Sequence, residues 1–204
     1  MAFVNEYHYE LADYGVGVVQ QKVYYRFQLP KLEINTRPIV PRQIELFSRL
    51  PINYQLKFET ATTPLHFDNG PSLSAIILDD SYYELLKNNV QHLNQMPILN
   101  AAALIFFKAN AHLDIIARQA AGQKIKHRAD TSKHFKDVCR LTSLLPVNGF
   151  DPLAVPKDCQ HDLQHFIMLL VKEDAMIFKR RFRANRDFNL TQAEVVTNLR
   201  GLLP

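Results

Sequence analysis

The sequence has only two cysteines, Cys139 and Cys159, and no CxxC spacing. This excludes a disulfide scaffold and a cysteine-rich zinc site, and Cys139, at an apolar position of an expected helix, is predicted to be a small core residue. No apolar run approaches the roughly 20 residues that span a bilayer. The first residues also lack the basic segment and apolar core of a secretory signal. We therefore expect a protein of the reducing cytoplasm that does not cross a membrane.

The motifs of common hydrolases and metalloenzymes are absent as well. No serine lies in a GxSxG setting, so serine-hydrolase chemistry is not expected. Eight histidines are present. His161 and His165 lie four positions apart and could share a metal with Asp162 or Cys159, but a solvated helix face produces the same spacing and is the favoured interpretation.

The composition is that of a soluble globular protein. The chain has 204 residues, of which 47% are hydrophobic and 22% charged, enough to bury a sizeable core. The formal net charge of +4 is modest. It is compatible with an anionic ligand and does not require nucleic acid.

The first part of the chain is rich in β-branched and aromatic runs separated by prolines, which predicts a mixed or antiparallel sheet. After a short helix at Phe3–Tyr14, the expected strands are Val16–Leu29, Lys31–Thr36, Gln43–Leu50 and Tyr54–Thr60, and Ser74–Leu78 is expected to be a strand or a turn. A helix is expected to begin at residues 79–81. The order of strands first and helices after predicts an α+β fold, with a sheet region over residues 1–90 and a helical bundle over residues 91–204.

Two further helices are expected near the end of the chain. A long amphipathic helix, Lys157–Arg183, places its apolar residues on one inner face, namely Leu163, Phe166, Ile167, Leu170 and Ile177. The last helix, Thr191–Leu203, begins with Thr191 and Glu194, which are spaced as a capping box.

The stretch Leu99–Leu145 predicts two helices joined by a basic loop, with Gly122 near the end of the first helix. The first apolar stripe is Ala101, Leu104, Ile105, Ala109, Leu113 and Ile116, and the second is Phe135, Val138, Leu141, Thr142 and Leu145. Lys108 lies within the first apolar face, and Asp137 lies at the inner edge of the second helix. Either the lysine stem is buried with its ammonium in water, or the lysine faces a phosphate and pairs with a carboxylate.

The patterns ALIxFKAxAxLD and RxDxxKHxxDVxRLxxLL in this stretch resemble the helical part of bacterial nucleotidyltransferase-like proteins related to abortive-infection toxins. The preceding segments YYRFQLP, PRQIELFSR, TPLHFD and SLSAIILDDSYY follow in the same order. The resemblance implies that Lys108 and Asp137 line a nucleotide site. It places Arg128, Asp130, Lys133 and His134 around them. Glu33 and Glu45 each lie between two apolar residues of an expected strand, a pattern typical of metal-binding strands and also of a glutamate on the wet face of a half-buried strand. The resemblance favours Glu45, in the IELFSR strand, as a metal-binding acid for Mg²⁺, and Glu33 is the second choice.

The Gly-Ser element and acid-x-acid pair of that superfamily are absent before Val16. Because one carboxylate cannot hold two metal ions, two alternatives stay open. A partner chain could supply two acids, and the protein would then transfer a nucleoside monophosphate from an NTP to RNA or protein. Otherwise the chain is a variant that has lost catalysis and binds a nucleotide or RNA through Lys108 and its basic neighbours.

A rival hypothesis is a non-catalytic protein on the same scaffold that binds RNA or forms a homo-oligomer. The RNA surface would combine the basic hairpin with Lys179–Arg186, which holds five basic residues in eight positions. Favourable cations at a helix C-terminus would give the same run.

Overall fold

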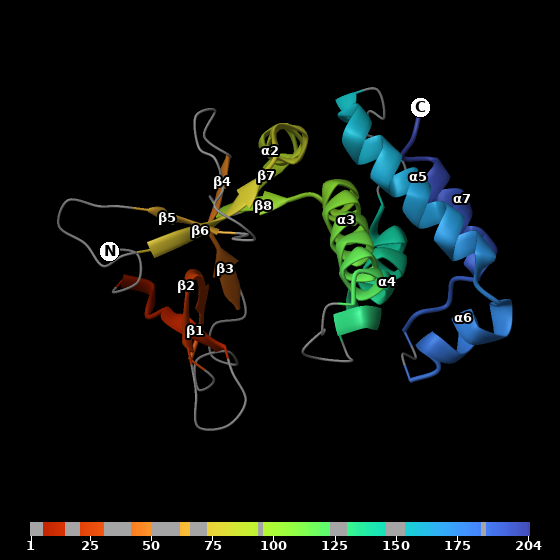
Figure 1. Cartoon of the computed structure of the whole chain (residues 1–204), viewed down its shortest axis with the longest axis horizontal. Coiled ribbons are helices and arrows are strands. Elements are labelled where there is room, and N and C mark those ends of the chain that lie inside the picture. Colours follow the sequence, from red (N-terminus) through yellow and green to blue (C-terminus); the bar gives the residue numbers. More distant parts are fainter. Residues whose placement is uncertain are drawn as a thin grey trace. The chain divides into compact units, whose positions relative to one another are not determined.

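The computed structural model of the chain describes residues 6–14, 21–30, 42–49, 62–65, 73–93, 96–122, 130–145, 154–184 and 187–204. The chain forms two compact units, Met1–Asp80 and Ser81–Pro204. Strands dominate the described part of the first unit and helices that of the second (Figure 1), which confirms the predicted α+β class. The predicted boundary between residues 90 and 91 lies after the observed one between Asp80 and Ser81, beyond the first helix of the second unit.

The described residues of the first unit form two three-stranded sheets. One is antiparallel, in the order β1-β2-β3, with β1 at Glu10–Tyr14, β2 at Gln21–Gln28 and β3 at Gln43–Glu45. The other is mixed, in the order β4-β6-β5, with β4 at Phe47–Arg49, β5 at Thr62–Leu65 and β6 at Leu73–Leu78. Tyr9, Phe27 and Leu29 are buried together, and Leu11, Ile44 and Leu46 pack against them.

The predicted strands at Val16–Leu29 and Ser74–Leu78 are present as β2 and β6. The predicted helix at Phe3–Tyr14 is wrong for Glu10–Tyr14, which pairs with β2 because its neighbour Tyr9 is buried beside Phe27. The predicted single strand at Gln43–Leu50 is divided between two sheets at Leu46. The expected strands at Lys31–Thr36 and Tyr54–Thr60 lie outside the described residues.

The second unit begins in helix α2 and a short hairpin of β7 and β8, and the helices α3 to α7 follow. The bounds are α2 Asp80–Asn88, β7 Val90–Leu93, β8 Met96–Leu99, α3 Ala101–Ala120, α4 Asp130–Leu141, the 3₁₀ turn η1 Thr142–Leu144, α5 Lys157–Lys172, α6 Ala175–Phe182 and α7 Gln192–Arg200. Helix α3 packs against α4 and α5, and α5 packs against α7 (Figure 1). The sequence analysis did not predict the β7-β8 hairpin.

Local capping defines several helix ends. The Asn100 side chain accepts a hydrogen bond from the Ala103 amide at 2.8 Å and begins α3. Gly122, with φ at 75°, follows the end of α3 as predicted. The capping box of Thr191 and Glu194 is also confirmed, at the start of α7.

The predicted single helix at Lys157–Arg183 is wrong, because the chain leaves helical geometry at Glu173 and Asp174. The Asp174 carboxylate accepts hydrogen bonds from the amides of Met176 and Ile177, at 2.9 and 3.1 Å, and so starts α6 as a separate helix. As a consequence Ile177, predicted to face inwards, is 41% exposed. None of the described helices is long and apolar enough to cross a membrane.

The core of the second unit lies between α3, α4, α5 and α7. Its fully buried side chains include Ile105, Phe106, Val138, Cys139, Leu163, Phe166, Leu170, Val195 and Leu199. Cys139 is therefore the core residue that was predicted. Burial, followed by the nearby Glu173 carboxylate, raises the pKa of its thiol, which makes this cysteine an unreactive one.

Candidate functional site

Lys108 and Asp137 meet across the hairpin of α3 and α4. The Lys108 Nζ lies 3.5 Å from the Asp137 Oδ2, and the two side chains are 31% and 24% exposed. The structure thus brings together the two hairpin residues that the sequence singled out. A half-buried ion pair holds the lysine stem against the helices and leaves its ammonium partly accessible to a ligand.

A second cation shares the same carboxylate. The Arg140 Nη1 lies 3.9 Å from the Asp137 Oδ1, and Arg140 is exposed. Lys133, also exposed, lies one turn before Asp137 on the same side of α4. The cations around Asp137 therefore outnumber its single negative charge, which favours an anionic ligand. The sequence analysis missed Arg140, although its spacing of three residues from Asp137 was a usable signal.

Helix α3 is held in position by a polar network on the side that faces α2 and α5. The Asp162 Oδ2 accepts hydrogen bonds from Asn110 Nδ2 at 2.9 Å and from Tyr82 Oη at 2.8 Å. One carboxylate thus ties three helices together. Because Asn110 is two residues from Lys108, this network also restrains the part of α3 that carries the lysine.

The other predicted phosphate-binding residues of the hairpin are described in part. His134 lies on α4 and is half-buried. Asp130 is the first residue of α4, and only its backbone is described. Arg128 lies outside the described residues.

Glu45, the predicted metal ligand, ends strand β3 of the first unit. Its Oε1 accepts hydrogen bonds from Arg26 Nε at 2.8 Å and from Gln43 Nε2 at 2.9 Å. Arg26 is its direct partner in the register of β2 and β3. The carboxylate is thus engaged in a cross-strand ion pair. The second choice, Glu33, lies outside the described residues.

Among the described residues, no three His, Cys, Asp or Glu side chains gather where they could hold a metal ion. Magnesium in nucleotidyl transfer needs carboxylate oxygens that converge on it, and Glu45 is instead bound to Arg26. His161 and His165 are both exposed on α5, as expected for a solvated helix face.

A buried histidine, which the sequence analysis missed, lies one turn beyond Lys108. His112 makes edge contacts with the rings of Phe135 and Phe166, each at a centroid distance of 5.5 Å. Its Nδ1 has no hydrogen-bond partner among the described residues. Burial, followed by the nearby charges of His134 and Arg181, lowers the pKa of His112 to about 4.

Acid is expected to destabilise the second unit through His112. The pKa of His112 in the folded protein, about 4, lies below the ordinary value of 6.5. At pH values between the two, the unfolded chain therefore binds more protons than the folded protein does. The free energy of unfolding therefore falls as the pH drops below 6.5, and this contribution is fully present above it. The loss between pH 7 and pH 5 is about 2 kcal/mol. Urea unfolding of the parent and of His112→Gln at both pH values measures it, and identical pH dependence in the two proteins would contradict the assignment.

The cations of the basic run at Lys179–Arg186 lie in two different environments. Lys179, Arg180 and Arg183 are exposed and form no ion pair with any described residue. Arg181 instead points inwards, where its Nη2 lies 2.6 Å from Glu173 Oε1. Arg186 lies outside the described residues.

Two groups of cations therefore stand out in the second unit, one at the hairpin and one on α6. The hairpin group includes a carboxylate that orients its lysine, whereas the exposed α6 cations have none among the described residues. Comparison of the chain with protein families, curated proteins and solved structures finds no match in any of the three.

Proposed function

We propose that this chain is a nucleotidyltransferase-like protein whose α3-α4 hairpin binds the phosphate groups of a nucleoside triphosphate. The observation that carries the proposal is the half-buried pair of Lys108 and Asp137, in which the lysine side chain is partly exposed and its Nζ lies 3.5 Å from the carboxylate. Arg140 and Lys133 lie on the same side of α4 as Asp137 and add positive charge. The resemblance of the hairpin sequence implies Lys108, Asp137 and Lys133 as site residues.

In this function Asp137 positions Lys108 rather than reacting itself. An ammonium that already lies against a carboxylate loses little side-chain freedom when a phosphate oxygen binds to it. Arg140, at 3.9 Å from the same carboxylate, can then balance the charge of Asp137 while Lys108 donates to the phosphate. The site is therefore suited to holding an anion.

Transfer of the nucleotide needs more than the described residues provide. If the chain carries out transfer, Mg²⁺ is the expected cofactor, and RNA or a protein hydroxyl is the expected acceptor. In the described part of the chain no three acidic or other metal-binding side chains gather, whereas two-metal transfer uses several carboxylates. We therefore assign nucleotide binding to this chain and place transfer in an assembly with a partner chain that contributes acids.

Loss of the Lys108 ammonium is expected to weaken nucleotide binding about tenfold, the effect of one charge-assisted hydrogen bond to a phosphate. Isothermal titration calorimetry with Mg-ATP and Mg-CTP on the parent and on Lys108→Ala measures this effect. Circular dichroism verifies that the variant is folded.

Arg118→Ala is the matched control for Lys108→Ala. Arg118 is an exposed cation on the same helix, and its Nη2 is paired with Asp114 Oδ2 at 2.9 Å. This variant should bind nucleotide as the parent does. Failure of both nucleotides to bind the parent, or an equal loss in Lys108→Ala and Arg118→Ala, would overturn the proposal.

A further inference from the structure

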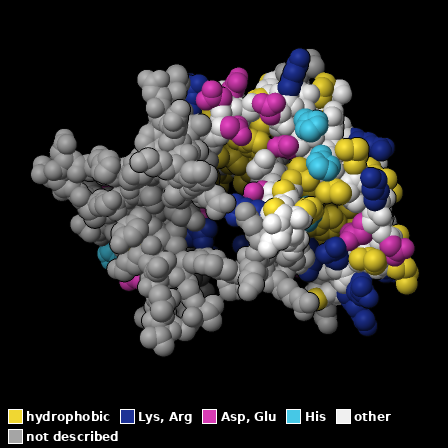
Figure 2. All heavy atoms as spheres, in the orientation of Figure 1, with side chains coloured by type: hydrophobic (Ala, Val, Ile, Leu, Met, Phe, Trp, Pro, Cys, Tyr) yellow, Lys and Arg dark blue, Asp and Glu magenta, His cyan; other side chains and the backbone are white. Residues whose placement is uncertain are grey.

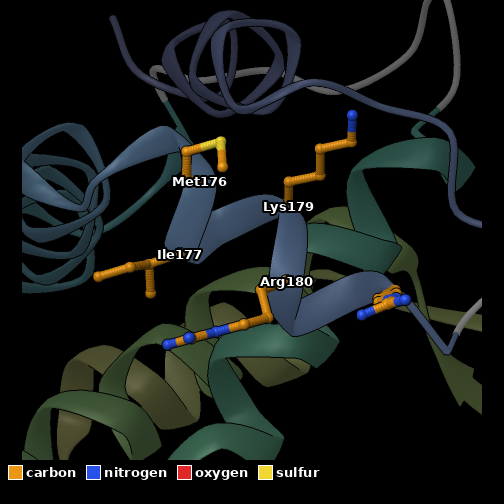
Figure 3. A pocket seen from close by; sticks show the side chains of 5 residues that line it. Met176, Ile177, Lys179 and Arg180 are labelled. Atoms are coloured by element: carbon orange, nitrogen blue, oxygen red, sulfur yellow. The ribbon is translucent and has the colours of Figure 1, made fainter.

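Helix α6 borders a hollow of about 610 Å³ that is lined by both apolar and cationic side chains. The lining residues are Met176, Ile177, Lys179, Arg180 and Arg183. Figure 3 shows the first four of these side chains arranged around one stretch of the helix. A volume of this size admits one or more side chains of another molecule.

The three cations of this hollow are available to a ligand. Arg183 lies four residues after Lys179 and three after Arg180, so it is a neighbour of both on the helix surface. None of them forms an ion pair with a residue in the described part of the chain, in contrast to Arg181, which is bound to Glu173. Favourable charge at the C-terminus of α6 does not by itself require this many unpaired cations.

The apolar residues of the hollow are unusually exposed. Met176 is 77% exposed, and Ile177 is also exposed. Met168 and Val171 on the preceding helix α5 are about half exposed. Figure 2 shows hydrophobic and cationic side chains close together on the face that carries α5 and α6. Exposed methionines are typical of surfaces that adapt to an apolar partner.

A second hollow, of about 510 Å³, extends the surface towards the start of α7. It shares Lys179 and Arg183 with the first hollow and adds the aromatic side chains of Phe178, Phe182 and Phe188. The rings of Phe182 and Phe188 are stacked with centroids 4.1 Å apart. Both hollows therefore combine an apolar lining with the same two cations.

From this combination we infer that α6 is a docking surface for an acidic amphipathic segment of a partner protein. Apolar side chains of the segment enter the hollows beside Met176 and Ile177, and its carboxylates meet Lys179, Arg180 and Arg183. A polynucleotide would use the cations but leave the exposed aliphatic side chains in water. A lipid surface would meet both kinds of residue but would not fill a concave site.

The probe for this surface is a fluorescein-labelled synthetic helix with leucines along one face and glutamates beside them. Its fluorescence anisotropy is measured against the parent chain. We expect it to bind at least about tenfold more tightly than the same helix with lysine in place of glutamate. Oligouridylate and phosphatidylglycerol vesicles serve as the competing ligands.

Three variants relate binding to the surface. Arg180→Glu is expected to weaken binding of the acidic helix about tenfold, and Met176→Ser about fivefold, since one removes charge attraction and the other apolar contact. Arg200→Glu, an exposed cation on α7 that lines neither hollow, should change binding less than about twofold. Circular dichroism of the parent and the three variants verifies that all four proteins are folded.

Each other outcome overturns the inference. Tight binding of oligouridylate or vesicles without binding of the acidic helix assigns the surface to nucleic acid or lipid. Sensitivity to Arg180→Glu without any effect of Met176→Ser identifies an unspecific polyanion site. An equal loss in Arg200→Glu means that overall charge governs binding. The inference does not depend on the nucleotide site, because Lys108 takes no part in it.

Discussion

Replacing Phe166 with alanine is expected to lower the free energy of unfolding of the second unit by about 3–5 kcal/mol. Phe166 is fully buried on α5. Its ring contacts His112 of α3 at 5.5 Å and Phe135 of α4 at 5.6 Å, measured between ring centroids. Alanine would leave a cavity where three helices meet, and close packing allows these helices to relax into it only partly. Denaturant unfolding, followed by circular dichroism, measures the loss.

Met168→Ala is the matched control for this substitution. Met168 lies on the same helix and is 54% exposed, so its removal should change the free energy of unfolding by less than about 0.5 kcal/mol. Similar losses in the two variants would mean that Phe166 is not at the centre of the core. The comparison also separates packing from helix propensity, because alanine is a strong helix former at both positions.

The parts of the second unit that were predicted correctly are those with a local cause. Threonine and glycine act on the helix ends beside them, so the capping box at Thr191 and the end of α3 near Gly122 could be located from sequence. The apolar stripes gave the correct faces for Ile105, Ala109 and Val138, which are fully buried. Periodicity identifies the buried face because burial follows the helical repeat.

The secondary-structure predictions that were wrong or missing depend on distant parts of the chain, or on a local signal that a stronger pattern concealed. Apolar periodicity continued across Glu173 and Asp174 and concealed the start of α6, where the Asp174 side chain caps a new helix. Residues Glu10–Tyr14 form a strand because β2 is available to pair with them. The same dependence on a distant partner explains the missed hairpin of β7 and β8, which has no strong turn signal.

The candidate site was predictable to the extent that helical spacing determines it. Lys108 and Asp137 could be placed on facing sides of a hairpin, and the structure has them 3.5 Å apart. Glu45 shows the limit of such reasoning. An acid between apolar residues of a strand looks the same in sequence whether it faces a metal or an arginine, and only the register of β2 and β3 brings Arg26 to it.

Arg181, near the end of α6, has a structural role. The sequence alone did not distinguish it from the neighbouring cations Lys179 and Arg180. Arg181 donates from Nε to Glu173 Oε1 at 2.6 Å, and its guanidinium lies 4.9 Å from the centre of the Phe135 ring. The Glu173 side chain is only 12% exposed. The ion pair joins the end of α5 to α6, while the ring contact joins α6 to α4.

Removal of Arg181 by substitution with alanine is therefore expected to cost about 3 kcal/mol of the free energy of unfolding, because Glu173 would keep a buried charge without its cation. Arg180→Ala, one residue away and exposed, should cost less than about 0.5 kcal/mol. The double variant Glu173→Gln with Arg181→Ala should recover part of the loss, since the unpaired charge is then gone. Urea unfolding of the four proteins gives these differences. A double variant no more stable than Arg181→Ala alone would contradict this assignment, because removing the unpaired charge of Glu173 would then recover nothing.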